Sequence, residues 1–96
     1  MLAEIHVSPS PAGTPDNHYA HVDAAIAVVE SSGLHYEVGA LGTTFEGQPD
    51  AVWATLRAAH EAVLAAGAQS VITSIRLAAG TADGVSMDSL TAKFRG

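Results

Sequence analysis

A reversal in the middle of the chain constrains the fold most, because residues 34–47 have the pattern of two short strands folded back on each other. Alternation in the first half places Tyr36 and Val38 on one face of a strand and their neighbours on the other. Gly39 and Gly42 flank the expected bend, since glycine reaches positive φ without steric cost. The sequence therefore predicts an amphipathic hairpin.

Strand and helix patterns alternate on both sides of this hairpin. Residues 2–8 alternate between apolar and polar, and the prolines that follow lack the backbone donors of a ladder, so we expect the first strand to end there. Apolar residues at helical spacing predict one helix before the hairpin and one after it. The predicted elements are a strand over 2–8, a proline-rich loop over 8–16, a helix carrying Tyr19, Val22, Ile26 and Val29 and ending near Gly33, the hairpin, a helix from Pro49 to about Ala66 that Gly67 ends, a strand over 69–77, a turn-rich linker over 78–84 and a short helix over 86–94.

The order strand, helix, strand, strand, helix, strand is the split β-α-β pattern of the ferredoxin-like fold. We therefore expect residues 1–96 to form one α+β domain, a βαββαβ sandwich in which two helices cover one face of a four-stranded antiparallel sheet. The covered face is predicted to hold Ile5, Val7, Tyr36, Val38, Phe45, Val71, Ile75 and Leu77, and the open face Glu4, His6, Glu37, Glu46, Ile72 and Arg76. Leu2 and Ile72 on the open face favour oligomerisation through sheet or edge contacts.

Charge and cysteine content exclude several classes of function. The formal net charge is -6 with only four Lys or Arg, which argues against binding to nucleic acids or anionic membranes. The chain has no cysteine and therefore neither disulfides nor thiolate metal sites. The first residues lack the features of a signal peptide, and no apolar run approaches the ~20 residues of a membrane span. We expect a soluble cytoplasmic protein.

His60 is the most informative single residue. It shares a predicted broad helix face with Val52, Trp53, Leu56, Val63 and Leu64. A titratable ring on a face that meets the sheet needs a partner, so His60 is interpreted either as a core histidine bonded to a strand carbonyl or threonine, or as a ligand contact. Tyr36, Thr43 and Thr73 have the parity of the same inner face and would give an apolar cavity a small polar patch, although threonine is also common in strands for propensity alone.

Glu46 and Trp53 each allow two interpretations. Glu46 is either a solvated charge at the end of a strand or, if turned into a cavity, a partner for a cation or an amino group. Trp53 is interpreted as core packing, with stacking on a ligand ring as the alternative. The histidines show no i, i+4 pair with a nearby acid, so no metal site is predicted. No nucleophile with an adjacent base and no phosphate-binding glycine motif is present.

The run SGLHYEVGALGTTFEG at 32–47, the pair His60-Glu61 and the strand VITSIRL together resemble the small stand-alone thiamine-binding protein family. That family shows Ser-Gly-Leu-x-Tyr, Met-Gly-Thr-x-x-Glu-Gly, a His-Glu pair and a Thr-x-Ile-Lys strand in corresponding places. Leu41 stands where methionine is frequent, and residues 78–80 replace an expected charged turn. The resemblance implies a ferredoxin-like fold, assembly into dimers or tetramers, and binding of thiamine or its pyrimidine precursor.

The leading hypothesis is non-catalytic binding of thiamine or a related hydroxymethylpyrimidine by a small homodimer or homotetramer, without a cofactor. The predicted ligand-binding residues are Tyr36, Thr43, Glu46, His60 and Thr73. If Glu46 contacts the ligand, Glu46→Gln should weaken the binding of a cationic ligand more than the binding of a neutral analogue. The alternatives are a small cofactor-free enzyme that uses His60 as general base, and a structural or regulatory oligomer without a small ligand.

Overall fold

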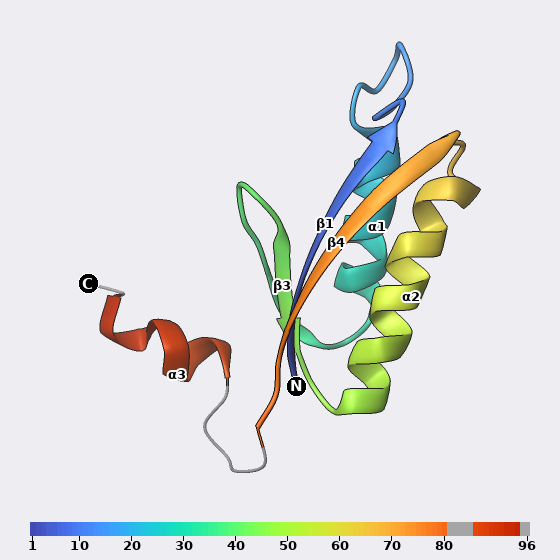
Figure 1. Ribbon diagram of the computed structural model, residues 1–96. Helices are drawn as coiled ribbons and strands as arrows, with labels where there is room; N and C mark the ends of the chain where they lie inside the picture. The colour runs from blue at the N-terminus through green and yellow to red at the C-terminus, as the bar shows by residue number, and fades with distance from the viewer. Residues whose placement is uncertain (81–85, 95–96) are drawn as a thin grey trace.

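The computed structural model describes residues 1–80 and 86–94 and shows a four-stranded antiparallel sheet with two helices on one face (Figure 1). The strand order is β2-β3-β1-β4. This confirms the predicted ferredoxin-like architecture. The elements are β1 (Leu2–Ser10), α1 (Ala20–Ser31), β2 (His35–Val38), β3 (Thr43–Glu46), α2 (Pro49–Ala65), β4 (Ser70–Ala78), α3 (Met87–Thr91) and a single 3₁₀ turn, η1 (Ala92–Phe94).

The strand registers assign side chains to the two faces as the alternation predicts. Ile5 lies opposite Thr43 on β3 and opposite Ile75 on β4, so these residues share the face that meets the helices. Glu4 pairs with Thr44 and Arg76 on the open face. The predicted division of the sheet into a covered and an open face is therefore confirmed.

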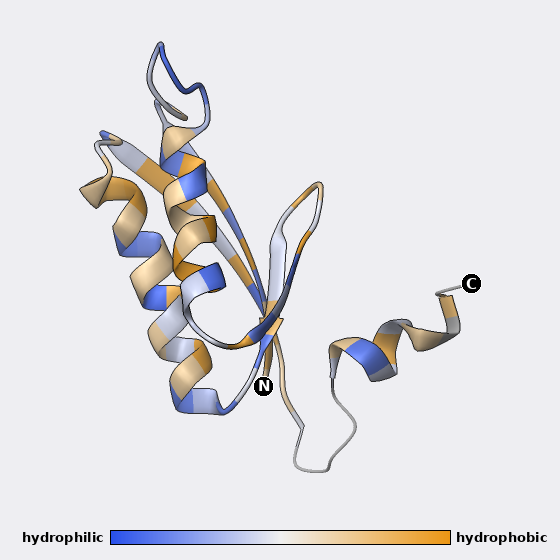
Figure 2. Cartoon of the chain, turned by 180° about the vertical axis from the view of Figure 1, so that it is seen from behind, coloured by the Kyte–Doolittle hydropathy of each residue, from blue (hydrophilic) through white to orange (hydrophobic). Residues whose placement is uncertain are grey.

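The core lies between the sheet and the two helices. Figure 2 shows hydrophobic and hydrophilic residues interspersed along α1 and α2. Each helix ends at the predicted glycine, because Gly33 and Gly67 adopt φ values of 81° and 121°, which other residues rarely reach. The largest fully buried side chains are Phe45, Leu56, Val29, Val52 and Val63.

Strand β1 runs two residues further than predicted. Pro9 and Ser10 still pair with β4, opposite Val71 and Ser70. The direction of the backbone groups explains why a proline is tolerated. Met1 and Gly47 exchange both of their hydrogen bonds, at 2.9 and 3.1 Å, so odd-numbered residues of this strand direct N–H and C=O toward β3. Pro9 therefore removes no donor from the ladder with β4.

The outer side of α2 is more exposed than predicted. Trp53 and Leu64 were expected on the core face, but their side chains are 52% and 45% exposed. Ile75 and Leu77 lie on the helix side of β4 and are 43% and 41% exposed. The helices cover the central strand β1, and the edge strand β4 lies at the margin of that cover (Figure 1).

The predicted C-terminal helix is present as α3 and η1, on the side of the sheet away from α1 and α2 (Figures 1 and 2). Ser86 and Ser89 form a capping box at its start, and the Met87 side chain is buried. Most of the predicted linker over 78–84 lies outside the described residues. Among the residues described, no helix has both the length and the apolar character that a membrane span requires.

Candidate functional site

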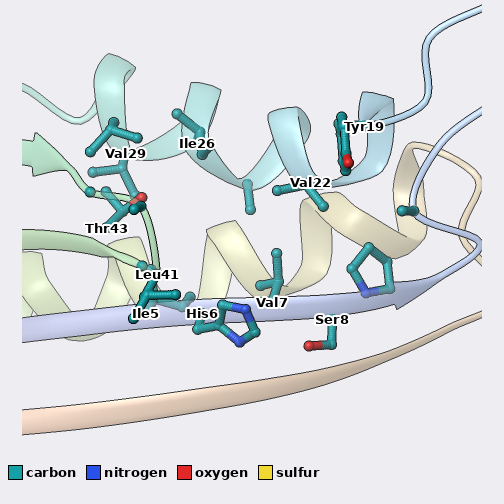
Figure 3. A pocket seen from close by; sticks show the side chains of 17 residues that line it. Ile5, His6, Val7, Ser8, Tyr19, Val22, Ile26, Val29, Leu41 and Thr43 are labelled. Carbon is teal, nitrogen blue, oxygen red and sulfur yellow. The ribbon is translucent and has the colours of Figure 1, made fainter.

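A cavity of about 380 Å³ lies between residues 5–9 of β1, helix α1 and the tip of the β2–β3 hairpin (Figure 3). Helix α1 contributes one wall, β1 a second and residues 38–43 a third. The lining residues are Ile5, His6, Val7, Ser8, Pro9, Ala12, Tyr19, Val22, Ala25, Ile26, Val29, Val38, Gly39, Ala40, Leu41, Gly42 and Thr43. This volume is within the range of small-molecule sites.

The cavity exists because the hairpin is shorter than the strand beside it. β4 pairs with β1 along residues 2–10, whereas β3 pairs with β1 only along residues 2–5. Beyond that point the hairpin tip separates from β1, as Figure 1 shows. Gly42 lies where the two strands are still close, since a Cβ there would meet the Ile5 carbonyl oxygen at 3.2 Å. Leu41, at the tip, is 86% exposed at the mouth of the cavity.

The walls are mainly apolar and carry a few polar groups. Val22 and Ile26 come from α1, with Tyr19 just before the helix (Figure 3). Thr43 begins β3 and is buried on the inner face. His6 lies on the other side of β1, at the rim (Figure 3). The arrangement suits a flat, mostly apolar ligand that has a few hydrogen-bonding groups.

A buried histidine that was not among the predicted site residues fixes the end of the cavity. His21 Nδ1 donates to the Pro11 carbonyl at 2.7 Å, and the His21 backbone N–H donates to the Ala12 carbonyl at 3.0 Å. These bonds hold the proline-rich loop against α1. The spacing of His21, four residues before Ala25 and eight before Val29, is the sequence signal that it faces inward.

The similarity of the whole chain to known proteins decides its family. The family model described as "Thiamine-binding protein" matches residues 3–95. The chain belongs to the thiamine-binding protein family.

Relatives of this thiamine-binding family member match along most of their length. A UPF0045 protein of Clostridium perfringens is 34% identical over 77 residues, which is 80% of each chain. The structure of a domain of unknown function, DUF77, from Bacillus cereus is 38% identical, with a TM-score of 0.87 over 98% of this chain and 88% of that one. A Thermotoga maritima protein provisionally assigned to thiamine biosynthesis or salvage shares the fold, with 20% identity and a TM-score of 0.77 over 99% of this chain and 100% of that one.

Two of the residues predicted to bind ligand in this thiamine-binding-family chain contact each other instead of the cavity. His60 Nδ1 and Thr73 Oγ1 are 2.6 Å apart, between α2 and β4. This bears out the bond to a threonine in the first interpretation of His60, although the residue is partly buried and not fully in the core. Of the five predicted residues, only Thr43 lines the cavity.

Tyr36 and Glu46 lie elsewhere in the domain. The Tyr36 hydroxyl is 3.5 Å from Glu30 Oε2 at the surface. Glu46 Oε2 accepts a hydrogen bond from the Met87 N–H at 2.9 Å, on the open face of the sheet. The structure therefore does not bring Tyr36, Thr43, His60 and Thr73 into one polar patch, because β2 and β4 are the two edges of the sheet, about 14 Å apart at the spacing of neighbouring strands.

Ionised side chains outside the cavity form local contacts. Glu61 accepts a bond from Arg57 Nε at 2.7 Å, and this hydrogen bond and the carboxylate charge raise the pKa of Arg57. In the described part of the chain, no cluster of three or more His, Asp or Glu is placed to hold a metal ion.

Proposed function

We propose that the cavity between β1, α1 and the hairpin binds thiamine or a related hydroxymethylpyrimidine without chemical turnover. One observation carries the proposal: a chain of the thiamine-binding protein family has a mainly apolar cavity of about 380 Å³ with polar groups at its rim. We place this binding in the cytoplasm, because a chain without cysteine suits a reducing compartment.

The walls match the chemistry of the ligand. Thiamine joins a flat aminopyrimidine ring to a cationic thiazolium ring. Val22 and Ile26 provide apolar contact for a ring, and Tyr19 provides an aromatic face near the mouth for the cation. The Thr43 hydroxyl is a buried hydrogen-bonding group. The net charge of -6 favours the approach of a cation.

The position of His60 supports binding without catalysis. Its Nδ1 is engaged with Thr73, and the residue is outside the cavity lining, so the proposed general base of the enzymatic alternative is remote from the ligand. Titration calorimetry with thiamine and with hydroxymethylpyrimidine, followed by chromatography of the recovered ligand, tests both points. We expect saturable binding and unchanged ligand.

Variants then locate the site. Tyr19→Ala and Thr43→Val should weaken binding, whereas His60→Ala, outside the lining, should not. Ligand consumption that is lost in His60→Ala would favour the enzyme. A folded protein that gives flat titrations with both ligands would favour the structural alternative.

We also propose that a second copy of the chain pairs with the free edge of β4. The even-numbered residues of β4 face β1, because they lie opposite the residues of β1 that direct their N–H and C=O away from β3. Val71, Thr73, Ile75 and Leu77 therefore present their backbone groups at the outer edge. A nine-residue edge strand with half-exposed apolar side chains is a template for strand pairing.

A two-fold axis suits this edge. Antiparallel pairing of β4 with its copy would join two sheets into one of eight strands and bring together the exposed Trp53 and Leu64 of the two α2 helices. The family resemblance implies dimers or tetramers, and this edge provides the dimer contact.

A further inference from the structure

The wall of the cavity formed by β1 includes a free strand edge. Among the described residues, pairing of β1 with β3 stops at Ile5, while β1 itself continues to Ser10. The edge of residues 6–9 that would face a longer β3 therefore faces the cavity, which these residues line.

Val7 is the residue whose backbone groups point to this edge. Met1 and Gly47 exchange both of their hydrogen bonds, so Met1 points toward β3, and alternate residues of the strand follow it. Val7 lies opposite Thr73 of β4 in the register, but its N–H and C=O point away from β4. Val7 as a whole residue is buried and lines the cavity, so the partner for a backbone donor and acceptor on this edge comes from within the cavity.

An extended residue has a specific partner chemistry. In a hydrogen-bonded antiparallel pair, the N–H and C=O of one residue exchange both bonds with one residue opposite. A pyrimidine that carries an amino group beside a ring nitrogen offers the same adjacent donor and acceptor. We propose that the Val7 N–H donates to the ring nitrogen of the ligand and that the Val7 C=O accepts from its amino group. This inference rests on the proposed function and names the atoms that select the ligand class, a 4-aminopyrimidine.

The same edge is poorly suited to a peptide strand. Pro9 is the next residue with this orientation and has no N–H, so Val7 provides the last N–H donor of the row within β1. The hairpin tip limits the gap on the other side, where Gly42 approaches Ile5. A strand needs a longer row of donors and acceptors than this, whereas a single ring needs one pair.

The first test compares thiamine with oxythiamine on the unmodified protein by titration calorimetry. Oxythiamine keeps the thiazolium ring but has an oxo group in place of the amino group, so that its donor and acceptor are reversed. We expect oxythiamine to bind at least about tenfold more weakly, since a mismatched pair leaves buried groups unpaired. Equal affinities would overturn the inference and leave the proposed function intact. Absence of binding by thiamine, hydroxymethylpyrimidine and oxythiamine would overturn both.

The second test addresses Val7 directly. Val7→Pro removes the N–H without removing a bond to β4, and Val7→Ala removes side-chain carbons while it keeps the N–H. We expect Val7→Pro to bind thiamine about tenfold more weakly than Val7→Ala, and similar affinities would contradict the assignment. The ¹⁵N–¹H spectrum of the unmodified protein gives an independent readout if Val7→Pro does not fold. The Val7 amide proton should move downfield and exchange more slowly with thiamine bound, and an unmoved Val7 signal would refute the contact.

Discussion

A charge placed on the free edge of β4 is expected to separate the proposed dimer. Ile75 lies on the helix side of this strand and is 43% exposed. Complete burial of an isoleucine stabilises by ~1.5–3 kcal/mol, so covering the exposed part of Ile75 contributes roughly 0.6–1.3 kcal/mol per copy. A two-fold interface contains the side chain twice, which gives about 1.3–2.6 kcal/mol per dimer. Ile75→Lys removes this contribution and adds two like charges.

The predicted change is a roughly 10- to 80-fold increase in the dimer dissociation constant, before charge repulsion is added. Analytical ultracentrifugation over a range of protein concentrations measures this constant. Ala27→Lys is the matched control, because it adds the same charge at an exposed position of α1. A folded Ile75→Lys variant that sediments like the unmodified dimer would show that this edge is not the interface. An unmodified chain that stays monomeric at high concentration would refute the dimer itself.

Three further variants test individual contacts. Glu46→Gln weakens the hydrogen bond to the Met87 N–H, so we expect faster amide exchange in residues 87–91 and a nearly unchanged affinity for thiamine; a selective loss of cationic ligand would instead support a ligand role for Glu46. His60→Ala should lower the free energy of unfolding by ~1–3 kcal/mol in urea titrations, because the partly buried hydroxyl of Thr73 loses its partner, and an unchanged midpoint would argue against that bond. Thr43→Val should keep the fold but weaken thiamine binding about three- to tenfold in calorimetry, and an unchanged affinity would remove Thr43 from the site.

The sequence predicted the architecture because each element carries a local signal. Period-2 alternation marked the strands, helical spacing marked α1 and α2, and Gly33 and Gly67 marked the ends of the helices. Alternation also assigned the sheet faces correctly, since side-chain direction in a strand depends only on residue parity.

Features that depend on strand order were beyond the local pattern. Parity placed Tyr36 and Thr73 on the same face, but only the sheet order shows that they belong to opposite edges. Pro9 remains in the ladder because the odd-numbered residues of β1 direct their backbone groups toward β3. The pairing of Met1 with Gly47, which lies 38 residues after Pro9, sets this orientation. The partner of Glu46, Met87, is 41 residues away in sequence.

The exact position of the cavity also depends on a long-range comparison. It follows from the difference between a four-residue β3 and a nine-residue β1, which alternation within either strand does not reveal. The exposure of Trp53 likewise depends on which strand α2 covers. Hydrophobic spacing identified the apolar face of α2 but not the strand against which that face packs.

The unequal lengths of the two sheet edges bear on how far assembly can proceed. β4 offers nine residues, whereas β2, at the other edge, offers four. Head-to-tail addition of β4 to β2 of the next molecule would generate an open filament, but the short β2 offers few backbone hydrogen bonds for such an interface. The proposed self-pairing of β4 would use the long edge of both molecules at once and would leave only the short β2 edges outside. The difference between the two edges thus favours a closed particle over fibre growth.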